Sequence, residues 1–216
     1  MLGLRWGDSS RTQDLDLAHA GKNMAIALPA SLEVDAHSAI ESLEMGLVPI
    51  VSLTSKAGTT YLNPKDPDFR LDFHTTLHRG KEAPYEHAQL GVVLRSLKFR
   101  EYLLEDVAQA ALFCDKGSII VNVPNPARYA FHKLMVYGER SASYLQKAGK
   151  DLRQAAGLLV WLKAHREWKL KAAWADLVGR GRGWTSRVKR GVGALDKFAP
   201  ELQFQAWLAP PNLSLT

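Results

Sequence analysis

The feature that most constrains the fold of this chain is a change of hydrophobic period near residue 124. Before that point, short apolar runs alternate with turn residues, as in the strands of a sheet. After it, apolar residues recur at helical spacing, first over residues 126–135 and again over residues 152–162. The pattern predicts an α/β half over residues 1–124 followed by a helical domain over residues 125–216.

The first half contains the predicted strands and one predicted helix. We expect strands at residues 14–18, 48–53, 69–75, 91–94, 101–104, 107–113 and 118–123. A helix is expected over residues 36–47, and residues 63–68 form a turn-rich break. Residues 115–117 would close a hairpin. Beyond residue 191 we expect one more helix and then an exposed extension.

Length and composition exclude several classes of protein. With 216 residues, 46% of them hydrophobic, the chain can form one large domain or two small ones. No apolar run is long enough to cross a bilayer and the N-terminus lacks a signal-peptide pattern, which predicts a cytoplasmic protein without a membrane partner. The single cysteine, Cys114, excludes an internal disulfide and a cysteine-based zinc site, and its apolar neighbours predict a core position.

The net charge is +6, and a positive surface attracts polyanions. Much of it gathers in a short segment that contains Arg180, Arg182, Arg187, Lys189 and Arg190. That segment is either a solvated basic loop and helix face or a patch that contacts RNA. Four tryptophans of the helical half either pack between helices or stack on bases: Trp161, Trp168, Trp174 and Trp184.

Three aspartates are the candidate catalytic and metal-binding residues. Asp14 and Asp16 are two positions apart on a predicted strand, so both carboxylates lie on one face and can bind the same cation or cation pair. Asp72, on another predicted strand, can supply a third ligand and help to activate an attacking hydroxyl. Alternatively, Asp72 pairs with Arg70 or Arg11, and the first two aspartates serve only solubility. Oxygen ligands of this kind suit Mg²⁺.

Other catalytic patterns are missing. The chain has no Gly-x-Ser-x-Gly elbow and no phosphate-binding loop of the Walker type. The spacing of His74, His78 and His87 matches no established zinc pattern, so these histidines are interpreted as scattered surface or hydrogen-bonded side chains.

Several separated segments, in order, resemble one family. They are Ser10 to Ala18 (SRTQDLDLA), Leu71-Asp72, Val121 to Leu134 (VNVPNPARYAFHKL) and Lys147 to Ala155 (KAGKDLRQA). Together they resemble bacterial nucleotidyltransferase-like proteins of the DNA polymerase β superfamily, which are related to abortive-infection toxin nucleotidyltransferases. The resemblance covers about residues 3–165.

The resemblance implies an α+β fold, in which a small mixed β-sheet forms the nucleotidyltransferase core and a C-terminal helical lobe follows. It implies an Mg²⁺-dependent enzyme that binds a nucleoside triphosphate such as ATP, with Asp14, Asp16 and Asp72 at its centre. Lys133 would reach the triphosphate, and Lys150 and Asp151 would support it. Alternatively, Lys133 lies on a solvated helix face and Lys150-Asp151 is ordinary helix-start polarity. The acceptor would be a hydroxyl of RNA (including tRNA), a protein or a small molecule, and a toxin role would add an unidentified antitoxin partner.

The sequence departs from the family pattern in front of Asp14. Superfamily members carry a Gly-Ser or Gly-Gly pair at a helix start there, which binds the phosphates. Here Gly3 is followed by Leu4 and Gly7 by Asp8, and only 13 residues precede Asp14. A group of polar residues could bind phosphate instead: Ser9, Ser10, Arg11 and Thr12. The alternative is a fragment or a catalytically degenerate module of the same fold that binds nucleotide or RNA.

Overall fold

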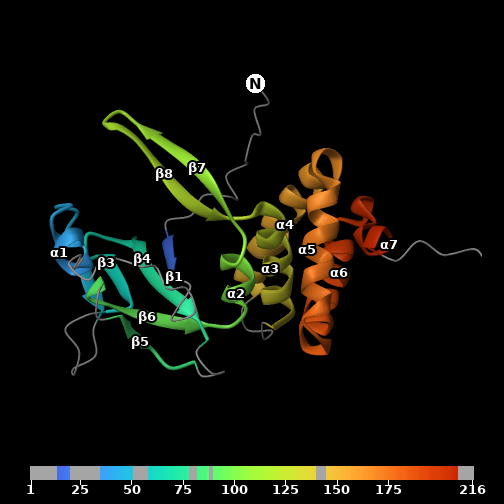
Figure 1. The fold of residues 1–216 in the computed structure, drawn as a ribbon, viewed down its shortest axis with the longest axis horizontal. Helices are drawn as coiled ribbons and strands as arrows, with labels where there is room; N and C mark the ends of the chain where they lie inside the picture. The colour runs from blue at the N-terminus through green and yellow to red at the C-terminus, as the bar shows by residue number, and fades with distance from the viewer. Residues whose placement is uncertain are drawn as a thin grey trace, which may run out of the picture. The chain divides into compact units, whose positions relative to one another are not determined.

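The computed structural model describes residues 14–19, 35–50, 58–77, 82–87, 90–139 and 145–208 (Figure 1). The chain forms two compact units. The sheet unit comprises the described residues of Arg11–Glu105, and the helical unit comprises the described residues of Asp106–Thr216. The sequence pattern changes from strand to helix later, at residue 124, and the division into domains 1–124 and 125–216 stays a prediction.

The sheet unit contains a mixed β-sheet. Its strands are β1 (Asp14–His19), β2 (Val48–Ile50), β3 (Thr60–Asn63), β4 (Asp66–Thr76), β5 (Tyr85–His87) and β6 (Val92–Leu97). Their order is β2-β3-β4-β6-β5, with β1 also paired to β4. The pairs β1/β4 and β4/β6 are parallel, whereas β2/β3, β3/β4 and β5/β6 are antiparallel. A mixed sheet followed by C-terminal helices confirms the predicted α+β fold.

One helix covers part of this sheet. α1 (Ala36–Glu41) begins after Asp35, whose carboxylate accepts hydrogen bonds from the backbone N–H groups of His37 and Ser38. The helix is shorter than predicted, because Glu44 adopts a positive φ of 52° and the chain turns there. The buried core that joins helix and sheet consists of Ile40, Leu47, Tyr61, Leu71, Phe73, Val92 and Leu94.

The strand predicted at residues 101–104 is wrong, since this segment is the helix α2 (Arg100–Leu104). Tyr102 and Leu103 are both buried, although they are consecutive. Neighbouring residues of a strand point to opposite faces, whereas a short helix can bury two in a row. Phe99, at φ 66°, precedes the helix and redirects the chain into it.

The helical unit begins with the hairpin of β7 (Val107–Cys114) and β8 (Gly117–Pro124), as the sequence predicts. The helices α3 (Pro126–Glu139), α4 (Leu145–His165), α5 (Glu167–Gly179) and α6 (Arg182–Phe198) follow. A 3₁₀ turn (Pro200–Leu202) and the short helix α7 (Phe204–Leu208) end the described chain. None of the described helices is long and apolar enough to cross a bilayer.

Helices α3 and α6 cross at two glycines. A Cβ placed on Gly191 would lie 2.1 Å from the carbonyl oxygen of Leu134, and one placed on Gly138 would lie 2.2 Å from that of Arg187. Both distances are well inside van der Waals contact, so only glycine permits this close approach. Trp174 packs against Phe131 with ring centroids 5.5 Å apart, which agrees with the first of the two roles considered for it.

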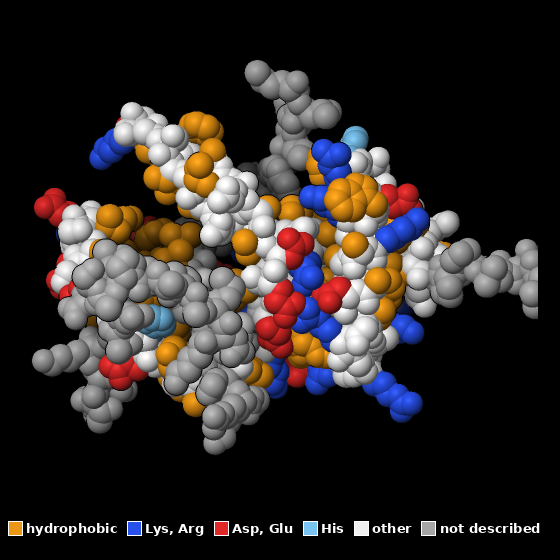
Figure 2. Space-filling model, in the orientation of Figure 1, with side chains coloured by type: hydrophobic (Ala, Val, Ile, Leu, Met, Phe, Trp, Pro, Cys, Tyr) orange, Lys and Arg blue, Asp and Glu red, His pale blue; other side chains and the backbone are white. Residues whose placement is uncertain are grey.

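The hairpin carries apolar side chains that the described residues leave exposed (Figure 2). Phe113 is 81% exposed and Ile120 is 71% exposed. Cys114, beside the turn, is exposed as well. The predicted core position of Cys114 is therefore wrong: its neighbours have strand propensity, but in this two-stranded sheet they do not form a buried face.

Candidate metal centre

The candidate metal centre lies where β1 and β4 pair in parallel. Their register aligns Asp16 with Asp72 and Ala18 with His74. Alternate residues of a strand share a face, so Asp72 and His74 project to the same side of β4. Asp16, Asp72 and His74 each offer one ligand atom, and the three atoms lie within 4.8 Å of one another. We call these three residues the carboxylate cluster.

The neighbouring strand holds Asp72 in place. Thr60 of β3 is the register partner of Asp72, and its hydroxyl donates a hydrogen bond to Asp72 Oδ1 at 2.5 Å. Among the described residues, neither Asp72 nor Asp16 forms an ion pair with a lysine or arginine. Of the two alternative partners considered for Asp72, Arg70 does not pair with it and Arg11 lies outside the described residues; a neutral hydroxyl, that of Thr60, is its hydrogen-bond donor.

His74 is the buried member of the cluster, with 6% of its surface exposed. Its Nδ1 lies 3.4 Å from Asp16 Oδ1 and 3.3 Å from Arg100 Nη2. Burial lowers the pKa of His74 and the Arg100 guanidinium acts in the same direction, while the carboxylates of Asp16 and Asp72 oppose the shift. A neutral imidazole keeps a nitrogen lone pair, which is what metal ligation requires.

The donor set fits a divalent cation. Two carboxylates this close repel each other, and a cation between them relieves that repulsion. Oxygen ligands suit Mg²⁺, whereas a nitrogen ligand such as His74 also suits transition metals. The side chain of Asp16 is 51% exposed, so the cluster is open to a ligand from solvent.

The other predicted site residues differ in what the structure describes of them. Asp14 belongs to β1 and its backbone pairs with Arg70, but its side chain is outside the described part. The predicted phosphate-binding residues Ser9, Ser10, Arg11 and Thr12 also lie outside the described residues. Their roles stay predictions.

Lys133 and Asp151 form a separate pair in the helical unit. Lys133 Nζ, on α3, lies 3.2 Å from Asp151 Oδ1, on α4, and 5.1 Å from the centre of the Tyr129 ring. The Asp151 side chain is only 5% exposed, and Lys150 beside it is half-buried. The pair links two helices and gives a buried carboxylate its counter-charge. The predicted contact of Lys133 with a triphosphate is not tested by this geometry.

Sequence reasoning missed His74, which it interpreted as a scattered histidine. The signal was present: His74 stands two positions after Asp72 on one strand, the same spacing that relates Asp14 to Asp16. Zinc patterns did not reveal it, because the other two candidate ligands are carboxylates and one of them, Asp16, comes from a second strand.

Comparison with known proteins identifies the family. Residues 1–179 match the model of a nucleotidyltransferase family, and the chain belongs to that family. The matched residues include the carboxylate cluster and the Lys133–Asp151 pair.

Among solved structures, the chain is similar to an antigenic nucleotidyltransferase-like protein from Paracoccidioides brasiliensis. The two are 16% identical, the match covers 83% of this chain and 76% of that one, and the TM-score is 0.35. No curated protein matches the chain.

Proposed function

We propose that this protein is an Mg²⁺-dependent nucleotidyltransferase, which transfers a nucleoside monophosphate from a nucleoside triphosphate to a hydroxyl acceptor and releases pyrophosphate. The observation that carries the proposal is the carboxylate cluster, whose ligand atoms lie within 4.8 Å of one another in a chain of the nucleotidyltransferase family. RNA, a protein or a small molecule could supply the hydroxyl.

The cluster supports the following residue roles. Asp16 and Asp72 would hold the cation, and Asp14 would join them if its side chain shares the face of Asp16, as strand alternation predicts. A bound Mg²⁺ would neutralise phosphate oxygens and stabilise the charge that develops during transfer. His74 adds a nitrogen atom to the set, so Mn²⁺ should be tested beside Mg²⁺.

The chain's own groups would handle the proton and the phosphates. The acceptor oxygen attacks the α-phosphorus, the bond from that phosphorus to the bridging oxygen breaks, and pyrophosphate leaves with the electron pair. Asp72, oriented by the Thr60 hydroxyl, would accept the proton of the attacking hydroxyl. Ser9, Ser10, Arg11 and Thr12 would bind phosphate, and Lys133, with Lys150 and Asp151 as support, would neutralise the leaving pyrophosphate.

Transfer can be measured directly. The full chain is incubated with each α-³²P-labelled nucleoside triphosphate, Mg²⁺ or Mn²⁺ and total RNA, and labelled RNA, protein and pyrophosphate are resolved. Asp16→Asn and Asp72→Asn should abolish labelling, while Asp68→Asn, an exposed acid on the same strand as Asp72, should not. Full activity in either cluster variant would remove these residues from the mechanism.

The second candidate is a binding module of the same fold that has lost turnover. The residues before Asp14 favour it, because the Gly-Ser pair of the family pattern is replaced by Gly3-Leu4 and Gly7-Asp8. This candidate predicts nucleotide or RNA binding that persists in EDTA, with no labelled product under any condition above. The finer expectations of a toxin role, an antitoxin partner and a cytoplasmic location remain predictions.

A further inference from the structure

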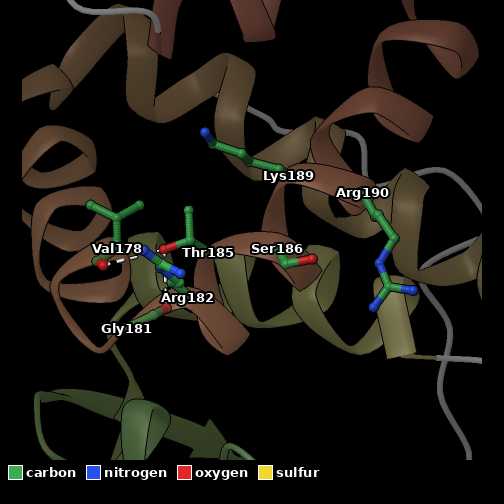
Figure 3. Close-up of a pocket in the computed structure, with 7 residues that line it drawn as sticks. All are labelled: Val178, Gly181, Arg182, Thr185, Ser186, Lys189 and Arg190. Carbon is green, nitrogen blue, oxygen red and sulfur yellow. Dashed lines mark hydrogen bonds between the residues drawn. The ribbon is translucent and has the colours of Figure 1, made fainter.

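A groove with cationic walls lies where α5 ends and α6 begins (Figure 3). Its volume is about 700 Å³, and Arg182, Lys189 and Arg190 line it together with the hydroxyl residues Thr185 and Ser186. We call it the cationic groove. All of these side chains come from α6, so one helix presents the whole charged wall.

The positive charge of this groove is not balanced within the described structure. Residues 177–195 contain five lysines and arginines and no acid. Arg180 pairs with Asp176 at 3.0 Å, and Arg187 pairs with Glu139. The other three cations, Arg182, Lys189 and Arg190, are exposed, and no described carboxylate pairs with them. The three that lack an acid are the three that line the groove.

The two hydroxyl residues of the groove differ in their contacts. The Thr185 hydroxyl donates to the carbonyl oxygens of Val178 and Gly181, at 3.2 and 3.1 Å, and so ties α6 to the end of α5. Ser186 is exposed and its hydroxyl remains available to a ligand. The groove therefore combines a hydrogen-bonded junction of α5 and α6 with exposed cations. A lysine binds phosphate as a point charge, and an arginine can donate two parallel hydrogen bonds to it.

The spacing of the cations suits a chain of phosphates better than a single anion. Lys189 and Arg190 follow Arg182 by seven and eight positions, which is about 10–12 Å along a helix that rises 1.5 Å per residue. Each strand of a DNA duplex presents one phosphate about every 3.4 Å along the helix axis. Three cations over this length can thus neutralise about three successive phosphates.

We propose that the cationic groove binds the phosphodiester backbone of a nucleic acid. The inference deepens the proposed function, because it names nucleic acid as the class of acceptor. It rests on the proposed function only in treating the bound nucleic acid as that acceptor. Residues from Arg180 onward lie beyond residues 1–179 that match the family model, so most of the groove is outside the matched part. Backbone contacts of this kind position a nucleic acid without reading its sequence.

The experiment measures binding of the full chain to a fluorescent 20-nucleotide RNA, and to DNA of the same sequence, in EDTA and across a series of salt concentrations. The groove variant is Arg182→Gln, Lys189→Gln and Arg190→Gln together. Its matched control removes the same charge at exposed lysines elsewhere, with Lys65→Gln, Lys116→Gln and Lys197→Gln. Circular dichroism melting of both variants verifies that they fold.

We expect the groove variant to bind RNA at least about tenfold more weakly than the control at moderate salt. The plot of log affinity against log salt has a negative slope, and its magnitude should decrease by about 2 in the groove variant. Three phosphate contacts are lost, and each contributes about 0.7 for a single strand. A folded groove variant that binds as tightly as the control would overturn the proposal. Loss for RNA alone would identify an RNA acceptor, and equal loss for DNA would identify the shared backbone; both support the groove.

Two further measurements distinguish binding of nucleic acid from binding of other anions. ATP binding should be the same in the groove variant and the control; a parallel loss of ATP binding would assign the groove to the donor nucleotide and overturn the proposal. The proposal would also be overturned if vesicles with anionic lipid bound through these cations and RNA did not. Asp72→Asn should keep RNA affinity. RNA binding by a wild type that never transfers label would refute the proposed enzyme and leave the groove intact.

Discussion

The carboxylate cluster of the sheet unit and the Lys133–Asp151 pair of the helical unit show two ways to place acids in a fold. The Asp151 side chain is 5% exposed and has a lysine 3.2 Å away, whereas the Asp16 side chain is 51% exposed and has no described lysine or arginine partner. A buried charge needs a permanent counter-charge, but an open one can recruit a cation from solvent. The contrast predicts that loss of the pair mainly reduces stability and that loss of the cluster mainly reduces ligand binding.

The largest effect should come from Asp72→Asn. Loss of a cation ligand and proton acceptor should reduce nucleotidyl transfer on the order of 10⁴-fold. Its melting temperature in EDTA should stay the same or rise, because one of two neighbouring negative charges is gone. Paired transfer assays and thermal melts measure both quantities. A large drop in melting temperature would mean that Asp72 stabilises the fold, and Asp72 and Asp151 would then not differ in role.

Asp151→Ala should have the opposite profile. Removing one partner of a buried ion pair leaves the other charge uncompensated, which destabilises by about 3–5 kcal/mol. Urea denaturation, followed by the loss of helical circular dichroism, measures this loss of unfolding free energy. Lys133→Met combined with Asp151→Leu should recover most of the stability, since an apolar pair needs no counter-charge. If that double variant is folded and fully active, Lys133 does not bind the triphosphate.

Metal ions should stabilise the protein only through the cluster. A cation present at 100 times its dissociation constant adds about 2.7 kcal/mol to the free energy of unfolding. Melting temperatures with Mg²⁺ or Mn²⁺ against EDTA report this gain. Asp16→Asn should lose it, while Asp68→Asn should keep it. Equal stabilisation of both variants by Mg²⁺ would place the ion elsewhere.

Thr60→Val should have the smallest effect and would sharpen the account of how Asp72 is held. Valine keeps the shape of threonine and removes only the hydrogen bond to Asp72. We expect a change in unfolding free energy of about 1 kcal/mol and a several-fold lower kcat with KM little changed. Steady-state kinetics measure the two constants separately. An unchanged kcat would show that the hydroxyl does not orient the carboxylate.

Local sequence patterns predicted much of the framework. Strand alternation predicted β1 and β4, the turn residues 115–117 predicted the hairpin, and the change of period predicted the helices after it. Segments whose pattern is short were harder: residues 100–104 form a helix with consecutive buried residues instead of a strand. Cys114 was misplaced because apolar composition indicates a preference for burial, but cannot show whether another element covers the strand.

The sequence by itself determined the class of fold, the family and two acids that the structure brings together, since these depend on residue types and on periods of a few residues. Only the tertiary structure decided which side chains meet. His74 joins the carboxylates because β1 and β4 pair in one register. Arg182, Lys189 and Arg190 line one groove without a described acid partner, because the nearby acids Asp176 and Glu139 pair with Arg180 and Arg187. Register and pairing join residues that are distant in the chain, and no local pattern contains that information.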